Sequence, residues 1–522
     1  MLRRTPLLVD AFIVLFLVAI HAGYISFPPA DPDVGGITYN AMLINRGMVP
    51  YRDSFEQKLP GAFFIAGACT RLLGESTLGL NIATLLWSAT HLIVIMWGVR
   101  RLWGAVPSRW AGVAFVLAST APVVSGRCPN YELWMTMPIT WAVLLVMTAQ
   151  NGSLPRIGLA GFLATAGVLV KQQAAFSCLP LVLWAVARIR SDGQRGLRES
   201  SALALGGALA TIPLLSYFAI HGELGTFVRM VDPRNAATYA AGGGTSANLI
   251  WRIARQETMR VVREMPLLYY AGTALLAAAA WHWVRSRDWN GLSLPAAWIL
   301  GAAVGVTAGM RFYTHYYVQL IPPLCIAVGW VIAQLRPSLG SSSREAVAVF
   351  LLAATLAWPS TGRVIQDARM AWWQARFTLQ GLEMPAIASV RLAQTIRRDV
   401  APQEKILVWG HAEDIYFLTN RLAPTRYYKY YAFLTPPPTT WGPPAFNPHA
   451  ADHAARFLHD ITVHPPGAIV VSSLMGSASP TIFSEFHTLL TTRYHHDASF
   501  DGLELWLPQP LPATGASTPP LQ

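Results

Sequence analysis

The sequence predicts a mostly α-helical membrane protein with about eleven transmembrane helices and a C-terminal soluble α/β domain. Of its 522 residues, 53% are hydrophobic and 13% are charged, which is about half the charged share of a typical soluble domain. Long apolar runs recur through residues 1–359 and are absent from 360–510. We therefore expect a membrane module over 1–359, an α/β domain over 360–510 and a disordered tail over 511–522.

The predicted spans are apolar runs that approach the roughly 20 residues needed to cross a bilayer. They lie near 6–26, 79–99, 108–125, 131–149, 155–170, 173–188, 200–220, 266–284, 293–310, 315–335 and 345–359. The run 60–73 is shorter and follows Pro60-Gly61, so we predict a juxtamembrane helix there, within a long first loop, 27–78.

Arginines set the predicted orientation of these spans. With the N-terminus in the cytoplasm, every turn after an even-numbered span has arginine within it or at its edge, as the positive-inside rule predicts. An odd number of spans then places residues 360–522 outside the cytoplasm. The formal net charge of +12 fits an anionic membrane surface, and we expect no nucleic-acid partner.

The C-terminal region has the alternating pattern of an α/β domain. We predict buried strands at 405–410 and 467–473 and an edge strand at 503–508. Helical patterns alternate with them near 384–399, 413–420, 449–460 and 480–492.

Polar side chains gather in the loops that this orientation places outside. The first loop carries Asp31, Asp33, Asp53, Glu56 and Lys58. A solvated loop with turn-forming residues is the ordinary explanation for any one of these acids. Here Asp31 and Asp33 precede a segment, 37–46, whose apolar spacing suits a helix lying in the membrane interface.

Three later outward positions add charge beside the apolar spans. Glu132 heads the fourth span, where an acid is also favoured by the helix dipole. Lys171 lies between two spans, and such a cation is usually paired or functional, unless it snorkels to the surface. The stretch GMRFYTHYYVQLIPP (309–323) is too dense in polar groups for packing alone to explain.

Four motifs resemble the bacterial family-39-type glycosyltransferases of the GT-C superfamily, which include aminoarabinose, galacturonic acid and protein-mannosyl transferases. They are Asp33, Tyr39, Gly47-Met-Val-Pro50-Tyr51-Arg-Asp53 and Lys58-Leu-Pro60-Gly61 in loop one; Asn130 and Glu132; Lys171 and Gln172; and Arg311 to Pro323. In the aminoarabinose and protein-mannose branches the loop-one Asp is commonly followed by Glu, whereas Val34 follows Asp33 here. The pattern is closer to transferases that add uronic acid or hexose to lipopolysaccharide cores.

The resemblance implies a GT-C fold and an inverting transfer of sugar from a polyprenyl-phosphate donor to a lipid or glycan acceptor, such as lipopolysaccharide. It implies Asp33 as the general base, with Asp31 as a rival and Glu132 orienting the acceptor or pairing with a cation. The expected donor-phosphate ligands are Lys58, Lys171 and Arg311, assisted by His315 and Tyr316. The remaining acceptor or loop positions are Tyr39, Asp53, Glu56, Asn130, Gln172 and Gln319. Basic side chains can suffice without a cofactor, and a divalent metal stays an open alternative.

Two other functions compete with this one. A protein O-glycosyl transferase of the mannosyl type would use the same donor chemistry. A transporter or flippase would instead place ionisable groups at mid-membrane, where Asp10 and His91 are the candidates. The enzyme hypothesis requires Asp33, Glu132, Lys171, Arg311 and His315 to converge, in an inner membrane protein whose C-terminal domain is extracytoplasmic.

Overall fold

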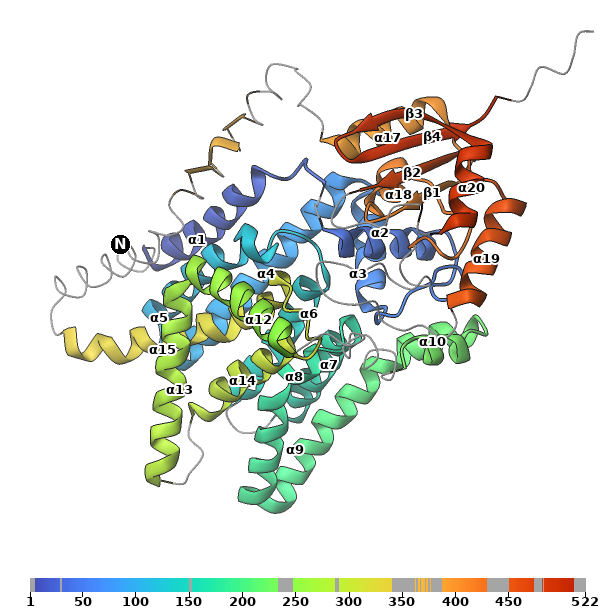
Figure 1. Cartoon of the computed structure of the whole chain (residues 1–522). Coiled ribbons are helices and arrows are strands. Elements are labelled where there is room, and N and C mark those ends of the chain that lie inside the picture. The colour runs from blue at the N-terminus through green and yellow to red at the C-terminus, as the bar shows by residue number, and fades with distance from the viewer. Residues whose placement is uncertain are drawn as a thin grey trace, which may run out of the picture. The chain divides into compact units, whose positions relative to one another are not determined.

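A computed structural model of the chain shows a helical part and a part that contains a β-sheet (Figure 1). It describes residues 5–28, 31–149, 153–232, 247–286, 291–339, 387–429, 450–473 and 483–510, with a few positions between 362 and 376 and residue 481. The chain forms two compact units. The first comprises Met1–Tyr51 and Gln57–Met384, and the second comprises Arg52–Glu56 and Pro385–Gln522. The predicted boundary at 359, the span 345–359 and the tail lie outside the described residues.

Apolar helices make up most of the first unit, because an apolar run in lipid must satisfy its own backbone hydrogen bonds. They are α1 (Thr5–Ala22), α4 (Thr77–Trp103), α5 (Ala105–Ser119), α6 (Tyr131–Met147), α7 (Leu154–Val170), α9 (Leu179–Ile220), α13 (Pro266–Ser286), α14 (Ser293–Thr307) and α15 (Ile321–Leu339). Each corresponds to one or two of the predicted spans.

Three of the described helical segments are long and apolar enough to cross a membrane: Thr77–Trp103, Leu179–Ile220 and Thr314–Leu335. Five shorter apolar helices accompany them. The chain is therefore a membrane protein by its helices, whereas the count of eleven spans stays a prediction.

The long helix α9 contains two of the predicted spans. Its backbone leaves the helical region at Asp192 and Gly193, where φ is −139° and 39°, and Figure 1 shows the chain reversing there. Arg188 on the first limb donates to Glu199 on the second at 2.8 Å. The arginine-rich turn between two spans is thus a closed helical hairpin.

Shorter helices connect these spans. They are α2 (Pro32–Asn45), α3 (Gly61–Leu73), η1 (Pro122–Val124), α8 (Ala174–Ser177), α10 (Leu224–Met230), α12 (Ala247–Glu264) and η3 (Thr314–Leu320). Every residue from Val34 to Leu43 in α2 is buried within the protein, and the position of 37–46 in the membrane interface stays a prediction. The helix packs against α3, so its apolar spacing reflects an interior position.

The second unit contains a four-stranded sheet in the order β1-β2-β4-β3. The strands are β1 (Ile406–Trp409), β2 (Ala468–Ser472), β3 (Tyr494–Phe500) and β4 (Leu503–Pro508). The helices are α17 (Ala388–Asp399), α18 (Asp414–Thr419), α19 (Ala450–Val463) and α20 (Ser484–Arg493). Strands β1 and β2 are parallel, whereas β4 runs antiparallel to both of its neighbours.

The prediction of an edge strand at 503–508 is wrong, since β4 pairs with β2 on one side and β3 on the other. Strand β3 was missed because His495 and His496 are exposed, and its polar pattern does not resemble a buried strand. Asp501 and Gly502 connect β3 to β4 with φ of 40° and 88°, a turn that favours an Asp-Gly pair.

Candidate active site

The start of α2 positions two carboxylates. Asp31 is the N-cap, and its Oδ1 accepts a hydrogen bond from the backbone N–H of Asp33 at 2.9 Å. Pro32 follows at the first helical position, where its missing N–H costs nothing. Asp33 lies in the first turn, where the helix dipole favours a negative charge. The sequence Asp-Pro-Asp thus fixes the direction of both side chains.

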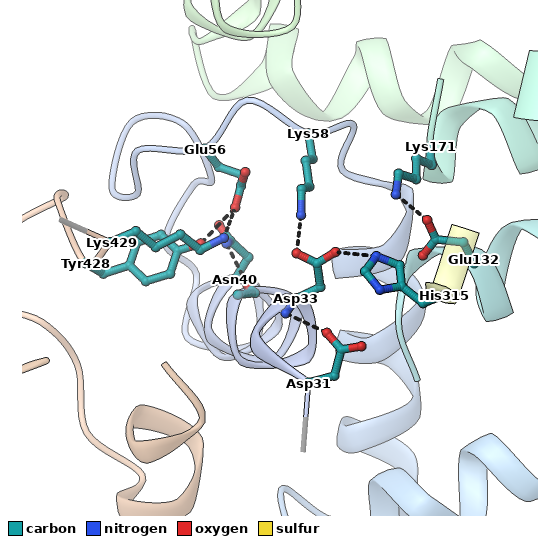
Figure 2. Close-up of polar contacts among 11 residues, drawn as sticks. Asp31, Asp33, Asn40, Glu56, Lys58, Glu132, Lys171, His315, Tyr428 and Lys429 are labelled. Atoms are coloured by element: carbon teal, nitrogen blue, oxygen red, sulfur yellow. Dashed lines mark hydrogen bonds and ion pairs between the residues drawn. The ribbon is translucent and has the colours of Figure 1, made fainter. Parts of the chain in front are cut away.

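Asp33 lies between two basic side chains (Figure 2). The Lys58 ammonium donates to its Oδ1, and the Nε2 of His315 lies 3.8 Å from its Oδ2. Burial of Asp33 opposes ionisation, but the charges of Lys58, His315 and Lys171 outweigh it and hold the pKa of this carboxyl well below its usual range. The Lys58 side chain is 30% exposed to solvent and the Asp33 side chain is 20% exposed, so a substrate can reach the pair.

Asp31 differs from Asp33 in its electrostatics. Burial raises the pKa of Asp31, and the nearby charge of His315 offsets this only in part. One of its oxygens is committed to the helix cap. Of the two rival bases, Asp33 is the more open, and Asp31 is buried to 8% exposure.

Lys58 is placed by close backbone packing on both sides. The Tyr51 hydroxyl donates to the backbone carbonyl of Lys58 at 2.6 Å. Three residues later, a Cβ on Gly61 would lie 2.7 Å from the carbonyl oxygen of Leu169, on the last turn of α7. The glycine of the Lys-Leu-Pro-Gly motif is therefore required for the approach of loop one to the chain that leads into Lys171.

Glu132 and Lys171 form a second ion pair, between α6 and the end of α7 (Figure 2). The side chain of Glu132 is fully buried and that of Lys171 is 7% exposed. Asn130 caps α6 by accepting from the backbone N–H of Leu133 at 3.1 Å. Lys171 is thus paired rather than snorkelling, and Glu132 has one oxygen without a hydrogen-bond partner among the described residues.

Two tyrosines join the ion pairs into one cluster. Tyr131 lies beneath both ammonium groups, 4.6 Å from Lys58 and 5.8 Å from Lys171, measured to the ring centroid. Tyr316 lies 4.2 Å from Lys171 and packs against His315 at 4.9 Å between ring centroids. Sequence reasoning missed Tyr131, although its position beside Glu132 was a usable signal. Lysines over aromatic faces gain attraction that does not consume their hydrogen bonds.

Arg311 lies in the loop that joins α14 to η3, four residues before His315. Both of its neighbours, Met310 and Phe312, have left-handed backbone with φ of 50° and 51°. Non-glycine residues rarely adopt this conformation, and it concentrates at functional sites. Gln319 follows on η3, donates to the Tyr316 carbonyl at 3.0 Å and lines a small cavity with Ser177 and Trp298.

The structure brings Asp31, Asp33, Lys58, Glu132 and Lys171 together with His315 and Tyr316, all in the first unit. Of the other candidates, Tyr39 is buried in α2, Asn130 is a helix cap, Gln172 is exposed, and Arg311 lies in the loop described above. Asp53 and Glu56 belong to the second unit, where Asp53 pairs with Arg52 and Glu56 with Lys429.

The two mid-membrane candidates for a transporter are satisfied by neighbours. Asp10 accepts from Arg100 at 2.6 Å and from Arg109 at 3.0 Å. His91 shares a hydrogen bond with Thr140 at 2.8 Å. The described residues contain no group of three His, Cys, Asp or Glu side chains that could hold a metal ion.

Residues 57–219 match the family model described as dolichyl-phosphate-mannose-protein mannosyltransferase. That segment contains Lys58, Glu132 and Lys171 of the cluster. No curated protein sequence matches the chain.

Two crystal structures of ArnT from Cupriavidus metallidurans are similar to this chain. The apo form has a TM-score of 0.56 at 14% identity, and the match covers 95% of this chain and 98% of ArnT. The form bound to undecaprenyl phosphate has a TM-score of 0.60 at 13% identity, covering 95% and 97%. The resemblance inferred from the four motifs is therefore confirmed at the level of fold, because the chain has the fold of ArnT.

Proposed function

We propose that this protein is an inverting membrane glycosyltransferase that moves a sugar from a polyprenyl-phosphate donor to a lipid or glycan acceptor. The observation that carries the proposal is the accessible Asp33–Lys58 pair beside His315. It places a candidate base and a candidate phosphate ligand in one site, and transfer from a phosphosugar needs both groups. The GT-C fold and the match over 57–219 support the same chemistry.

In the proposed step, the acceptor hydroxyl attacks the anomeric carbon on the face opposite the phosphate. Asp33 takes the hydroxyl proton as the new C–O bond forms, a contribution of about 10²–10⁴-fold for general bases. The bond from the anomeric carbon to the phosphate oxygen breaks, and polyprenyl phosphate leaves with the electron pair. Lys58 stabilises the additional negative charge, with Lys171 and Arg311 as further cations.

Lys58 also links donor binding to the basicity of Asp33. In the free protein its ammonium helps to hold the pKa of Asp33 well below its usual range, which makes the carboxylate a weak base. A donor phosphate that draws Lys58 away lets the pKa of Asp33 rise toward the range where a general base works best. The base is then activated when the donor is in place.

We assign the reaction to the outer face of the cytoplasmic membrane and the second unit to the extracytoplasmic side. The support is the arginine distribution, which favours a cytoplasmic position for the Arg188–Glu199 hairpin of α9. A lipid-linked donor suits that outer face, where nucleotide sugars are not supplied. The acceptor we favour is an envelope glycolipid such as lipopolysaccharide.

A protein O-glycosyl transferase is the second candidate. The observation in its favour is the family match itself, whose description names a protein mannosyltransferase. The donor chemistry and the role of Asp33 are the same in both proposals. They differ in the acceptor, which is a protein hydroxyl in this case.

The test compares cells that lack the protein with cells that regain it. Mass spectrometry of their lipids, glycans and proteins should show one sugar-bearing species lost on deletion and restored by the wild-type chain. Asp33→Asn should fail to restore it, because the amide cannot accept the proton. Asp31→Asn is the matched control, since Asn also caps helices well.

If Asp33→Asn fully restores the sugar-bearing species, Asp33 is not the general base. Loss with Asp31→Asn alone would transfer that role to Asp31. Identical lipid, glycan and protein profiles with and without the protein would sink the proposed function. A change confined to glycoproteins would favour the second candidate.

A further inference from the structure

The basic helix α12 has no part in the site described above. Its buried side chains Ile253, Glu257 and Val261 are four residues apart, so they form one row along the helix. That row faces the protein, and the Thr258 hydroxyl beside it shares a hydrogen bond with the Tyr317 hydroxyl of η3 at 2.5 Å. This packing fixes which face of α12 is turned outward.

The outward face of α12 carries four exposed arginines: Arg252, Arg255, Arg260 and Arg263. Arg260 lies 3.7 Å from Glu257, whereas the other three have no ion pair within the part of the chain that the structure describes. Arg252 and Arg263 are separated by close to three helical turns, so they lie on the same side of the helix. Guanidinium groups without an acidic partner favour an anionic ligand, and phosphate suits them best.

Large apolar side chains lie among these arginines. Trp251 is 71% exposed and Met259 is 44% exposed. With Arg255 between them, they form a row in which each residue lies about one helical turn from the next. Water solvates the arginines but not the Trp251 ring, whereas the boundary between lipid headgroups and acyl chains suits both kinds of side chain.

The chain that follows α12 connects it to a membrane surface. One residue, Met265, separates α12 from α13 (Pro266–Ser286), which corresponds to the predicted span 266–284. Exposed aromatic side chains lie near both ends of α13, with Tyr270 67% exposed near the start and Trp281 62% exposed toward the other end. Tyrosine and tryptophan gather at the two membrane–water interfaces. We therefore expect the C-terminal end of α12 to lie beside one of these interfaces.

We infer that the outward face of α12 binds the headgroups of anionic phospholipids in the membrane that surrounds the protein. The arginines contact the lipid phosphates, while Trp251 and Met259 enter the boundary between headgroups and acyl chains. A lipid surface is the occupant because a soluble anion would satisfy the arginines alone and leave both apolar side chains in water. The inference uses no group of the cluster around Asp33, so it stands apart from the proposed function.

The test uses the full chain in nanodiscs of phosphatidylcholine, with and without phosphatidylglycerol. Hydrogen exchange of the peptide 247–264 measures the protection of α12. Phosphatidylglycerol should slow this exchange by about tenfold, because the anionic lipid binds the folded helix and not the opened one. High salt should remove most of the added protection, since it screens charges at the membrane surface.

Three triple variants separate the charges of α12 from the net charge of the protein. The first neutralises the arginines that lack an acidic partner and should lose the added protection: Arg252→Gln, Arg255→Gln and Arg263→Gln. The second replaces the same three residues by lysine, keeps the charges and should retain most of the protection. The matched control removes three exposed charges from the second unit and should behave as the wild type: Lys405→Gln, Arg456→Gln and Arg493→Gln.

Equal exchange of the wild type in the two lipid compositions would overturn the inference. Full protection in the glutamine variant of α12 would do the same. Loss of protection in the matched control would show an effect of net charge alone and would also overturn it. Inorganic phosphate that protects α12 in detergent as strongly as phosphatidylglycerol does in nanodiscs would replace the lipid surface with a site for a small anion.

Discussion

Two carboxylate–lysine pairs include the neighbouring loop-one residues Glu56 and Lys58, yet the pairs have different surroundings. Asp33–Lys58 belongs to the first unit, and Glu56–Lys429 belongs to the second. The first pair keeps 20–30% of its side-chain exposure and shares its charges with His315 and Lys171. The second is at most 6% exposed, and a tyrosine hydroxyl completes its hydrogen bonds. The same chemical groups are thus open in one unit and sealed in the other.

The two pairs consist of the same kinds of residue, so residue type does not tell a pair that binds substrate from one that holds the structure. Solvent exposure of the side chains does. In an exposed pair the lysine can leave the carboxylate for a substrate phosphate, and the pKa of the carboxyl then rises. A sealed pair cannot exchange partners without unfolding its surroundings. Glu132–Lys171 is sealed as well, with 0% and 7% exposure, but it touches the open cluster through Tyr131.

Glu132→Gln gives the largest effect on stability that we expect. It leaves the Lys171 ammonium buried without its counter-charge, at a cost of about 3–5 kcal/mol. Thermal unfolding of the full chain in detergent measures this loss. The double variant Glu132→Gln with Lys171→Met should recover most of the stability. If Glu132→Gln is as stable as the wild type yet inactive, Glu132 takes part in the reaction and is not a structural partner of Lys171.

Lys58→Met comes next and acts on the open pair. It should weaken undecaprenyl phosphate binding by about 10²-fold, because a cation facing the phosphate is removed. It should also raise the pKa of Asp33, since Lys58 is the leading cation that lowers it.

The pH dependence of transfer follows from that shift. In the wild type the acidic loss of kcat/KM should lie below the usual Asp range, because Asp33 stays ionised until the pH falls through its lowered pKa. In Lys58→Met the residual activity should be lost at a higher pH. An acidic limb that stays in place would show that Asp33 is not the titrating base.

The smallest effect concerns the carboxyl of Asp414 at the start of α18. Burial raises its pKa from 3.8 to about 6, and backbone N–H groups and Ser389 offset this only in part. The folded state therefore binds this proton more tightly than the unfolded state does. Stability should fall by about 2 kcal/mol as the pH rises from 4 to 6. Asp414→Asn should flatten this slope, as read by hydrogen exchange of β1 and α18. An unchanged slope in Asp414→Asn would show that another group titrates.

The apolar helices and the residues of the cluster were predictable, because each rests on local sequence. Apolar runs that lack polar partners can only form helices in lipid. Asp33, Lys58, Lys171 and His315 stood out as charged groups beside such runs, and the structure gathers them. Their order along the chain matched a known set of motifs. That match predicted that the side chains meet in one site, which their spacing alone could not.

What could not be predicted depends on contacts between distant segments. Apolar spacing does not show that Val34 to Leu43 of α2 are buried within the protein. Nothing local in Arg52–Glu56 shows that Glu56 pairs with Lys429, 373 residues away. The partners of β4 were missed for the same reason, since pairing on a second edge is set by a hairpin whose outer strand is polar.

The outer strand β3 has a consequence for how the second unit meets other protein chains. An exposed edge strand offers unpaired backbone groups to any other chain, and proteins guard such edges with charge and bulges. Strand β3 presents exposed His495, His496 and Asp497, and its register with β4 shifts between His496 and Ala498. The bulge twists the edge away from a flat template. Both features disfavour pairing of this edge with the edge strand of another copy.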